Sequence, residues 1–184
     1  VCASPSLPTL LTDAEVEEWL AKGKNAETGK SGMNAPEFSD IIAVNAVSYT
    51  SASPGTKAIG MLGHSMNAVA VPKNGTLTYD FTSDKDGDAT LYTAMIPTQP
   101  NDSGDLRYAV RIDDGEETVI SLKEPFRSER WKKNVLRGQA LRTTPVHITK
   151  GQHTLTIRAL DAHIVADQWM IDFKPNRKFY LIPA

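Results

Sequence analysis

The sequence lacks both a cysteine pair and a long hydrophobic run. Cys2 is the only cysteine among the 184 residues, so the chain can form neither an internal disulfide nor a thiolate metal site. No apolar run approaches the roughly 18–20 residues of a membrane-spanning helix, and no signal-peptide hydrophobic region is present. Because the first residue is Val1, we interpret the sequence as a piece of a longer protein. In that protein, Cys2 is either a leftover terminal thiol, which we favour, or the acylated cysteine of a lipoprotein.

An excess of charge of one sign is also lacking. The 20 basic residues against 22 acidic ones leave a net charge of −2, so nothing directs the chain to nucleic acid or to an anionic membrane. The hydrophobic content of 40% and the charged content of 23% are ordinary for a globular protein. The length suits one domain with an appendage and is enough to bury a core.

The first 40 residues differ in pattern from the rest. The segment Thr12-Asp13-Ala14-Glu15 has the spacing of a capping box and predicts one short helix near residues 13–22. A loop or linker follows from Gly23. We therefore divide the chain into an N-terminal helix and linker, 1–40, and a main domain, 41–184.

From Ile41 onward, apolar and polar residues alternate in many short runs. In one of them, Leu155 and Ile157 alternate with threonine and arginine, a pattern typical of an antiparallel strand with one buried face. Turn formers separate the runs, and Asp86-Gly87 and Asp114-Gly115 favour hairpins. The pattern predicts an all-β fold: an antiparallel β-sandwich of the jelly-roll type, with the short N-terminal helix attached. The expected core residues are Tyr79, Phe81, Leu91, Tyr108, Val110, Ile112, Leu155, Ile157, Trp169 (with an outward orientation as its alternative) and Ile171.

One short segment resembles the nucleophile turn of α/β-hydrolases. Gly63-His64-Ser65-Met66-Asn67 is one residue short of G-x-S-x-G, because Asn67 replaces the second glycine. The motif also needs a strand–turn–helix context in a parallel sheet, and no βαβ alternation is present. We therefore predict that Ser65 is chemically inert and assign no catalytic residue.

A second segment, "DKDGD", resembles a calcium loop. Asp84, Asp86 and Asp88 fit the first three ligand positions, but the glycine comes one residue early, at Gly87. Met95 stands where the bidentate glutamate belongs. A solvated hairpin turn explains the segment better, with a weak calcium contact as the alternative. The histidines offer no ligand pair at helical spacing, so we assign no metal site.

The stretch from Lys123 to Arg142 is rich in cations and contains one tryptophan. An aromatic ring can stack on the C–H bonds of a pyranose while amide and cationic groups bind hydroxyls or a carboxylate. In the alternative, the tryptophan closes one end of the sandwich and the cations are merely solvated. The candidate carbohydrate-binding residues on this connection are Trp131, Asn134, Arg127, Arg130 and Arg137.

Two long segments resemble the C-terminal domain of family 115 glycoside hydrolases, which are α-glucuronidases acting on glucuronoxylan. They read "LTYDFTSDKDGDATLYTAMIPTQPNDSGDLRYAVRIDDGEETVISL" and "RSERWKKNVLRGQALRTTPVHITKGQHTLTIRALDAHIVADQWMIDF". The specific motifs are Y-x-F, R-Y-A-V-x-I-D-D-G, W-x-x-N-V-L, G-x-H-T-L and the closing I-D. The resemblance covers about Ile41 to Phe173, so the N-terminal helix and the closing "NRKFYLIPA" lie outside it.

The resemblance implies a β-sandwich similar to carbohydrate-binding modules, with the catalytic carboxylates in preceding domains absent here. We therefore expect a non-catalytic accessory domain that binds or positions a plant polysaccharide such as glucuronoxylan. The alternative is a structural or dimerisation domain that binds no sugar, and a free-standing enzyme is third. The expected partners are a polysaccharide or oligosaccharide and the catalytic domain of the parent enzyme. The expected location is secreted, periplasmic or at the cell surface.

The sequence departs from the family pattern in two places. His64 stands where the family's G-x-G-R-[ST] segment has arginine, so we add His64 to the candidate carbohydrate-binding residues and treat Ser65 as structural. The family domain typically begins with Glu-Ala-Glu, and related sandwiches use such a glutamate to hold a structural calcium. Here the matching residues are Asn45-Ala46-Val47, which argues against calcium; no other cofactor is expected.

Overall fold

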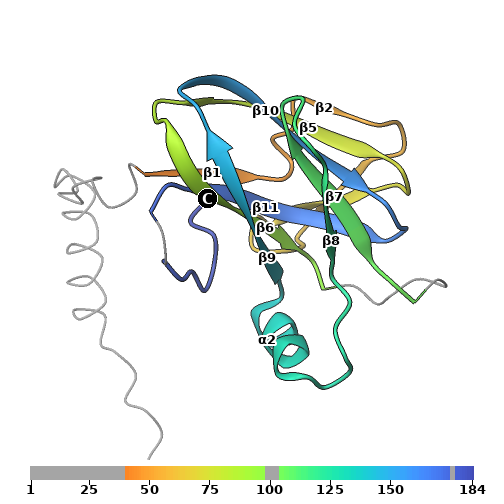
Figure 1. Ribbon diagram of the computed structural model, residues 1–184. Helices are drawn as coiled ribbons and strands as arrows, with labels where there is room; N and C mark the ends of the chain where they lie inside the picture. Colours follow the sequence, from red (N-terminus) through yellow and green to blue (C-terminus); the bar gives the residue numbers. More distant parts are fainter. Residues whose placement is uncertain (1–39, 98–103, 175–176) are drawn as a thin grey trace, which may run out of the picture. The chain divides into compact units, whose positions relative to one another are not determined.

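The computed structural model describes residues 40–97, 104–174 and 177–184 (Figure 1). The helix predicted near residues 13–22 and the linker after it lie outside the described residues. The described chain forms two antiparallel sheets and one short helix, which confirms the predicted antiparallel sandwich.

The first sheet has the strand order β3-β4-β11-β6-β9, and β1 also pairs with β11. Its strands are β1 (Ile41–Asn45), β3 (Lys57–Gly60), β4 (Asn67–Val71), β6 (Gly87–Met95), β9 (Ala140–Ile148) and β11 (Ile164–Asp172). The second sheet has the order β2-β5-β10-β7-β8. Its strands are β2 (Ser51–Ala52), β5 (Thr76–Ser83), β7 (Arg107–Ile112), β8 (Thr118–Ser121) and β10 (Gly151–Ala159).

The core lies between the two sheets and follows the alternation in the sequence. In β10, Leu155 and Ile157 are fully buried, while Thr154 and Thr156, which alternate with them, are partly exposed. Trp169 of β11 is buried too and lies edge-on to the rings of Tyr79 and Phe81, with centroid distances of 5.5 Å to each. The predicted core is confirmed, with Ile112 packed at its margin, and Trp169 takes the inward orientation.

A second apolar layer covers the outer face of the first sheet. Tyr92 and Met170 point away from the main core and pack with Ile182 and Phe179 of the C-terminal segment. The Tyr92 hydroxyl also donates to the backbone oxygen of Arg177, at 3.0 Å. Because both of its faces are covered, β11 is buried along its whole length.

Helix α2 (Glu129–Arg137) joins β8 to β9 at one end of the sandwich (Figure 1). Sequence analysis treated this connection as a loop. The helix begins because the Ser128 side chain accepts a hydrogen bond from the Trp131 backbone N–H, and it ends at Gly138, which adopts the left-handed conformation. Both capping signals are visible in the sequence.

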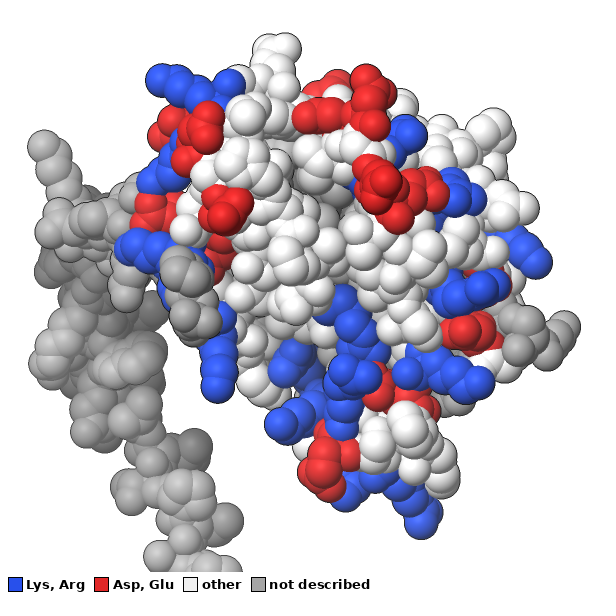
Figure 2. Space-filling model, in the orientation of Figure 1, with Lys and Arg blue, Asp and Glu red and all other residues white. Residues whose placement is uncertain are grey.

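The strand register places α2 and the acidic turns at opposite ends. Met95 of β6 pairs with Ala140, directly after α2, whereas Gly87 pairs with Ile148 at the other end. The β5–β6 turn, with Asp84 and Asp86, therefore lies far from the helix, as does the acidic β7–β8 turn. Figure 2 shows lysine and arginine gathered around α2, and acidic side chains together with further lysine and arginine toward the upper end of the same view.

Candidate functional site

A cavity of about 170 Å³ lies between α2 and the neighbouring strand ends. Trp131 and Asn134 of α2 form part of its wall, so the structure brings these two predicted residues together. The remaining lining residues are Pro97, Leu106, Leu122, Lys123, Glu124, Phe126, Val135 and Ala140. We call this cavity the Trp131 cleft.

An aromatic pair forms the outer part of the cleft. The Trp131 ring is half-buried and meets the Phe126 ring edge to face, with centroids 5.1 Å apart and planes at 68°. Phe126 is 72% exposed, and the Arg127 guanidinium lies 5.1 Å from its centroid. Arg127 therefore contacts the cleft through Phe126. Trp131 does not plug the sandwich completely, because part of its ring remains open to solvent.

Asn134 is a polar group in the wall of the cleft. The residue is only 6% exposed, and it lines the cavity beside Trp131. A polar side chain in the wall of a cleft can hydrogen-bond to a ligand or to water there. An amide can both donate to and accept from a hydroxyl.

The charged groups of the cleft centre on Glu124. Its nearly buried carboxylate accepts a hydrogen bond from Arg142 Nη2 and forms an ion pair with Arg130 Nε, and the N–O distance is 2.5 Å in each case. Burial lowers the pKa of Arg142, but the adjacent carboxylate favours its charged form. Lys123 adds a further cation to the lining, so positive charge exceeds negative charge around the opening.

Arg137 and His64 do not line the Trp131 cleft. The Arg137 guanidinium lies 5.3 Å from the ring centroid of Tyr180, in the C-terminal segment. The His64 ring contacts the end of the helix, where Nε2 lies 2.6 Å from the Arg137 carbonyl oxygen. Because a carbonyl can only accept, Nε2 must carry the proton. Sequence reasoning thus missed Phe126, Lys123 and Glu124 as lining residues, and an aromatic in a polar connection was the available signal for Phe126.

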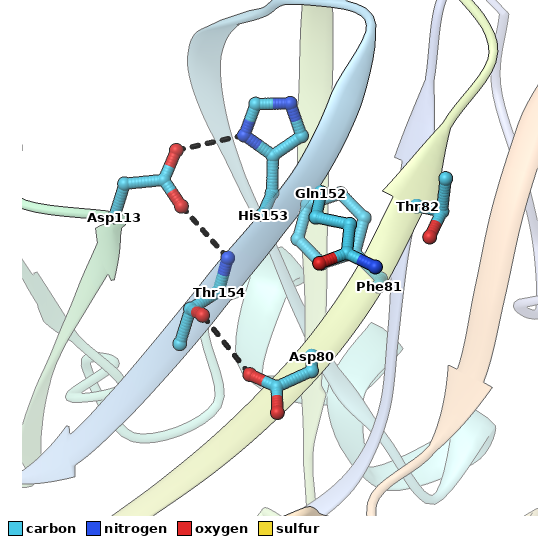
Figure 3. Close-up of a pocket in the computed structure, with 7 residues that line it drawn as sticks. All are labelled: Asp80, Phe81, Thr82, Asp113, Gln152, His153 and Thr154. Carbon is cyan, nitrogen blue, oxygen red and sulfur yellow. Dashed lines mark hydrogen bonds and ion pairs between the residues drawn. The ribbon is translucent and has the colours of Figure 1, made fainter.

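A second, shallower cavity of about 330 Å³ lies at the other end, over β5 and β10 (Figure 3). The polar groups here bind one another. Asp113 accepts from the Thr154 backbone N–H and from His153 Nδ1, both at 2.7 Å, and the Thr154 hydroxyl donates to Asp80 at 3.0 Å. With these partners in place, the cavity is a weaker candidate than the Trp131 cleft.

His153 holds this second cavity together. Its Nδ1 binds the Asp113 carboxylate and its Nε2 binds the Thr149 carbonyl oxygen, each at 2.7 Å. Burial lowers the pKa of His153, but the two acceptors raise it by more, so the net shift is upward. Both acceptors favour the doubly protonated imidazolium.

The segment around Ser65 has a structural explanation. The Ser65 hydroxyl donates to Asp167 at 2.6 Å, and the neighbouring His64 ring is directed to α2 instead. A nucleophilic serine needs a histidine that accepts its proton. The observed contacts therefore agree with an inert Ser65.

The residues that might hold calcium do not gather into a site. Among the residues that the structure describes, no group of three or more His, Cys, Asp or Glu side chains is placed to hold a metal. In the turn that resembles a calcium loop, Asp88 is almost fully exposed and pairs with His147. At the start of the domain, the Asn45 side chain accepts from Gln168 at 3.0 Å.

Comparison with known proteins gives one family and several structures. The profile of the glycosyl hydrolase family 115 C-terminal domain matches residues 31–184, whereas no curated protein matches the chain. A family 115 4-O-methyl-α-glucuronidase with specificity for decorated arabinogalactans has 32% sequence identity and a TM-score of 0.64. The match covers 71% of this chain but only 17% of that enzyme.

Two carbohydrate-binding modules share the fold at low identity. The family 6 module of the laminarinase LamC from Zobellia galactanivorans matches 72% of this chain and 98% of its own, with 12% identity and a TM-score of 0.53. A family 6 module of lichenase 5A from Cellvibrio mixtus, solved with cellotriose, matches 72% and 97%, also with 12% identity, at 0.54. In the described parts of the chain, no helix is long and apolar enough to cross a membrane.

Proposed function

The chain belongs to the C-terminal domain family of the family 115 glycoside hydrolases, and from this premise we propose that it binds or positions a plant polysaccharide such as glucuronoxylan. This family domain is an accessory domain rather than the catalytic one. The parent protein is then a carbohydrate-active enzyme, of which an α-glucuronidase is the first candidate, and it acts in the periplasm, at the cell surface or outside the cell.

The Asn134 amide in the cleft wall beside the Trp131 ring carries this proposal. A sugar ring stacked on Trp131 places its hydroxyls where the amide can both donate and accept. The cations around the opening add affinity for a uronic acid, because charge-assisted hydrogen bonds to a carboxylate are the stronger kind. This pairing of a ring with an amide and cations favours sugar binding over simple closure of the sandwich.

Titration of glucuronoxylan oligosaccharides into the chain tests the proposal. We expect weak binding, with a dissociation constant between about 1 μM and 1 mM. Trp131→Ala should weaken binding roughly tenfold, equivalent to about 1.4 kcal/mol. Affinity for a uronic ligand should also fall as salt rises, because the contributing cations are exposed.

Asn134→Ala separates a binding role from a structural one. If the amide serves a ligand, its removal should weaken binding while the melting temperature stays close to that of wild type. Leu136→Ala is the matched control, since this residue lies on the same helix, is 82% exposed and does not line the cleft. Equal binding by wild type and both cleft variants would exclude the Trp131 cleft as the site.

A structural or dimerisation role without sugar binding is the alternative, and one group of exposed apolar side chains favours it. Met61 is 83% exposed, Leu136 82% and Tyr180 66%. The three belong to segments that the contacts of His64 and Arg137 bring together. Exposed apolar side chains of this kind mark protein–protein contacts where they form one contiguous patch. Absence of glycan binding by the wild-type chain would favour this alternative.

A further inference from the structure

Among the residues that the structure describes, the buried carboxylate of Asp167 has no cationic partner. Asp167 is fully buried at an irregularity of β11, where the pairing with β6 shifts register between Ala166 and Gln168. Along β11, β4 pairs with residues up to Ala166 and β1 pairs from Gln168 onward, so Asp167 falls between them. A buried charge needs compensation from nearby groups.

Hydrogen-bond donors provide this compensation on both carboxylate oxygens. Oδ1 accepts from the Ser65 hydroxyl at 2.6 Å and from the Ser65 backbone N–H at 3.1 Å. Oδ2 accepts from the His64 backbone N–H at 2.8 Å and from Gln139 Nε2 at 2.7 Å. A carboxylate that accepts several N–H and O–H bonds is stabilised in its charged form.

The backbone of Gly63 makes this arrangement possible. Gly63 has a left-handed φ of 75°, which turns the following N–H groups toward one point and forms an anion-binding concavity. A Cβ added to Gly63 would lie within 2.7 Å of every atom of the Asp167 carboxylate group. The glycine at this turn therefore lets the backbone approach and enclose the carboxylate.

Two of the three neighbouring amide oxygens are occupied as well, whereas Gln139 Oε1 is buried with no hydrogen-bond partner among the described residues. Gln139 Nε2 also donates to Gln168 Oε1 at 2.9 Å, and Gln168 Nε2 donates to Asn45 Oδ1 at 3.0 Å. The backbone oxygen of Asp167 accepts from the Ala46 N–H at 2.8 Å. Calcium needs six to eight oxygen ligands. Here a cation would find one carboxylate, at which four donor groups already point, and one unpartnered amide oxygen, which together fall short of that number.

We propose that this donor network replaces the structural calcium of related sandwiches, so that the domain folds without a metal ion. Asn45, at the position of a family glutamate, is linked through Gln168 to Gln139 and Asp167, and the network joins β1, β11 and the start of β9. It also reaches α2, because His64 binds the Arg137 carbonyl oxygen and Gln139 directly follows the C-cap Gly138. If the proposed function holds, sugar binding is metal-independent too.

Thermal unfolding of the 184-residue chain with EDTA, and with millimolar CaCl2, tests this inference. We expect the same melting temperature in both, and no saturable heat when Ca²⁺ is titrated in a calorimeter. The proposal would be overturned if Ca²⁺ raised the melting temperature saturably in the double variant Asp86→Asn/Asp88→Asn of the exposed turn but not in Asp167→Asn. If Ca²⁺ raises the melting temperature of wild type but not of the turn variant, the ion binds at the turn and the proposal stands.

Substitution of Asp167 independently tests how much the donor network stabilises the domain. Asp167→Asn places an amide NH2 against groups that are all donors, so the melting temperature should fall by several degrees or the chain should fail to fold, with Ca²⁺ giving no rescue. Asp88→Asn is the exposed control and should melt like wild type. Should Asp167→Asn not fold, Ser65→Ala, which removes the hydroxyl donor to Oδ1 but keeps the backbone N–H, should melt lower than wild type. A wild-type melting temperature in both Asp167→Asn and Ser65→Ala would contradict the proposal. None of these measurements involves sugar, so failure here leaves the proposed function untouched.

Discussion

At the scale of single residues, Gly63 is the glycine at which an added side chain would make the closest contact. A left-handed alanine costs roughly 1–3 kcal/mol through backbone strain alone. Gly104 has nearly the same φ, 72° against 75°, and has only the end of the Lys123 side chain nearby, at 3.9 Å. We therefore expect Gly104→Ala to show the strain alone and Gly63→Ala to lose clearly more unfolding free energy, as measured by chemical denaturation. Equal losses would mean that Asp167 moves aside without cost.

Which site residues could be predicted from the sequence depends on how local their contacts are. Trp131 and Asn134 were predictable, because an aromatic and an amide three residues apart share one short connection. The location of Arg137 was not, because it is set by Tyr180 and His64, both far away in the sequence. Asp167 gave no signal either, since an aspartate within a strand normally faces solvent, whereas every residue of β11 is buried.

At the scale of elements, the C-terminal segment is part of the fold rather than an appendage. Ile182 is 5% exposed against the outer face of the first sheet, whereas its neighbour Leu181 is 38% exposed. Ile182→Ala should reduce the unfolding free energy by about 2 kcal/mol or more, because it leaves a space over Tyr92 and Met170. Leu181→Ala should change it by about 0.5 kcal/mol or less, and denaturant titration of the two variants compares them.

The elements themselves were predictable to different degrees. Strands with one buried face, such as β5 and β10, follow directly from their alternating residues. β11 does not alternate, because the C-terminal segment covers its outer face, and that covering is a tertiary contact without a local pattern. Helix α2 was missed although Ser128 and Gly138 cap it, because its apolar residues are few and its core contact is limited.

At the scale of the whole molecule, His153 makes stability depend on pH. Because the pKa of His153 is raised in the folded state, protonation of its imidazole stabilises the fold. This stability is fully present below the unfolded pKa of 6.5 and is lost as pH rises through the folded pKa. For Asp113, burial raises the pKa, but His153 and the Thr154 N–H lower it by more, so its contribution is lost only as pH falls through that lowered pKa. The His153–Asp113 pair therefore stabilises the folded state most in mild acid.

We expect a higher unfolding free energy near pH 5.5 than at pH 8, from denaturant titrations at the two pH values. His153→Gln should remove most of this difference, because glutamine does not titrate. The exposed His147 is the control, and His147→Gln should retain the difference. An unchanged difference in His153→Gln would assign the pH dependence to other groups.

The separation of charge between the two ends has a consequence for how the molecule meets a charged polymer. Its net charge of −2 would be weakly repelled by a polyanion if it were spread evenly. With cations around α2 and carboxylates at the far turns, the molecule is an electric dipole instead. Within a Debye length of about 8 Å at physiological salt, the field of a polyanion exerts a torque that turns α2 toward it before contact. The molecule is thus oriented during its approach to the polymer. Added salt first lowers the fraction of encounters that lead to binding.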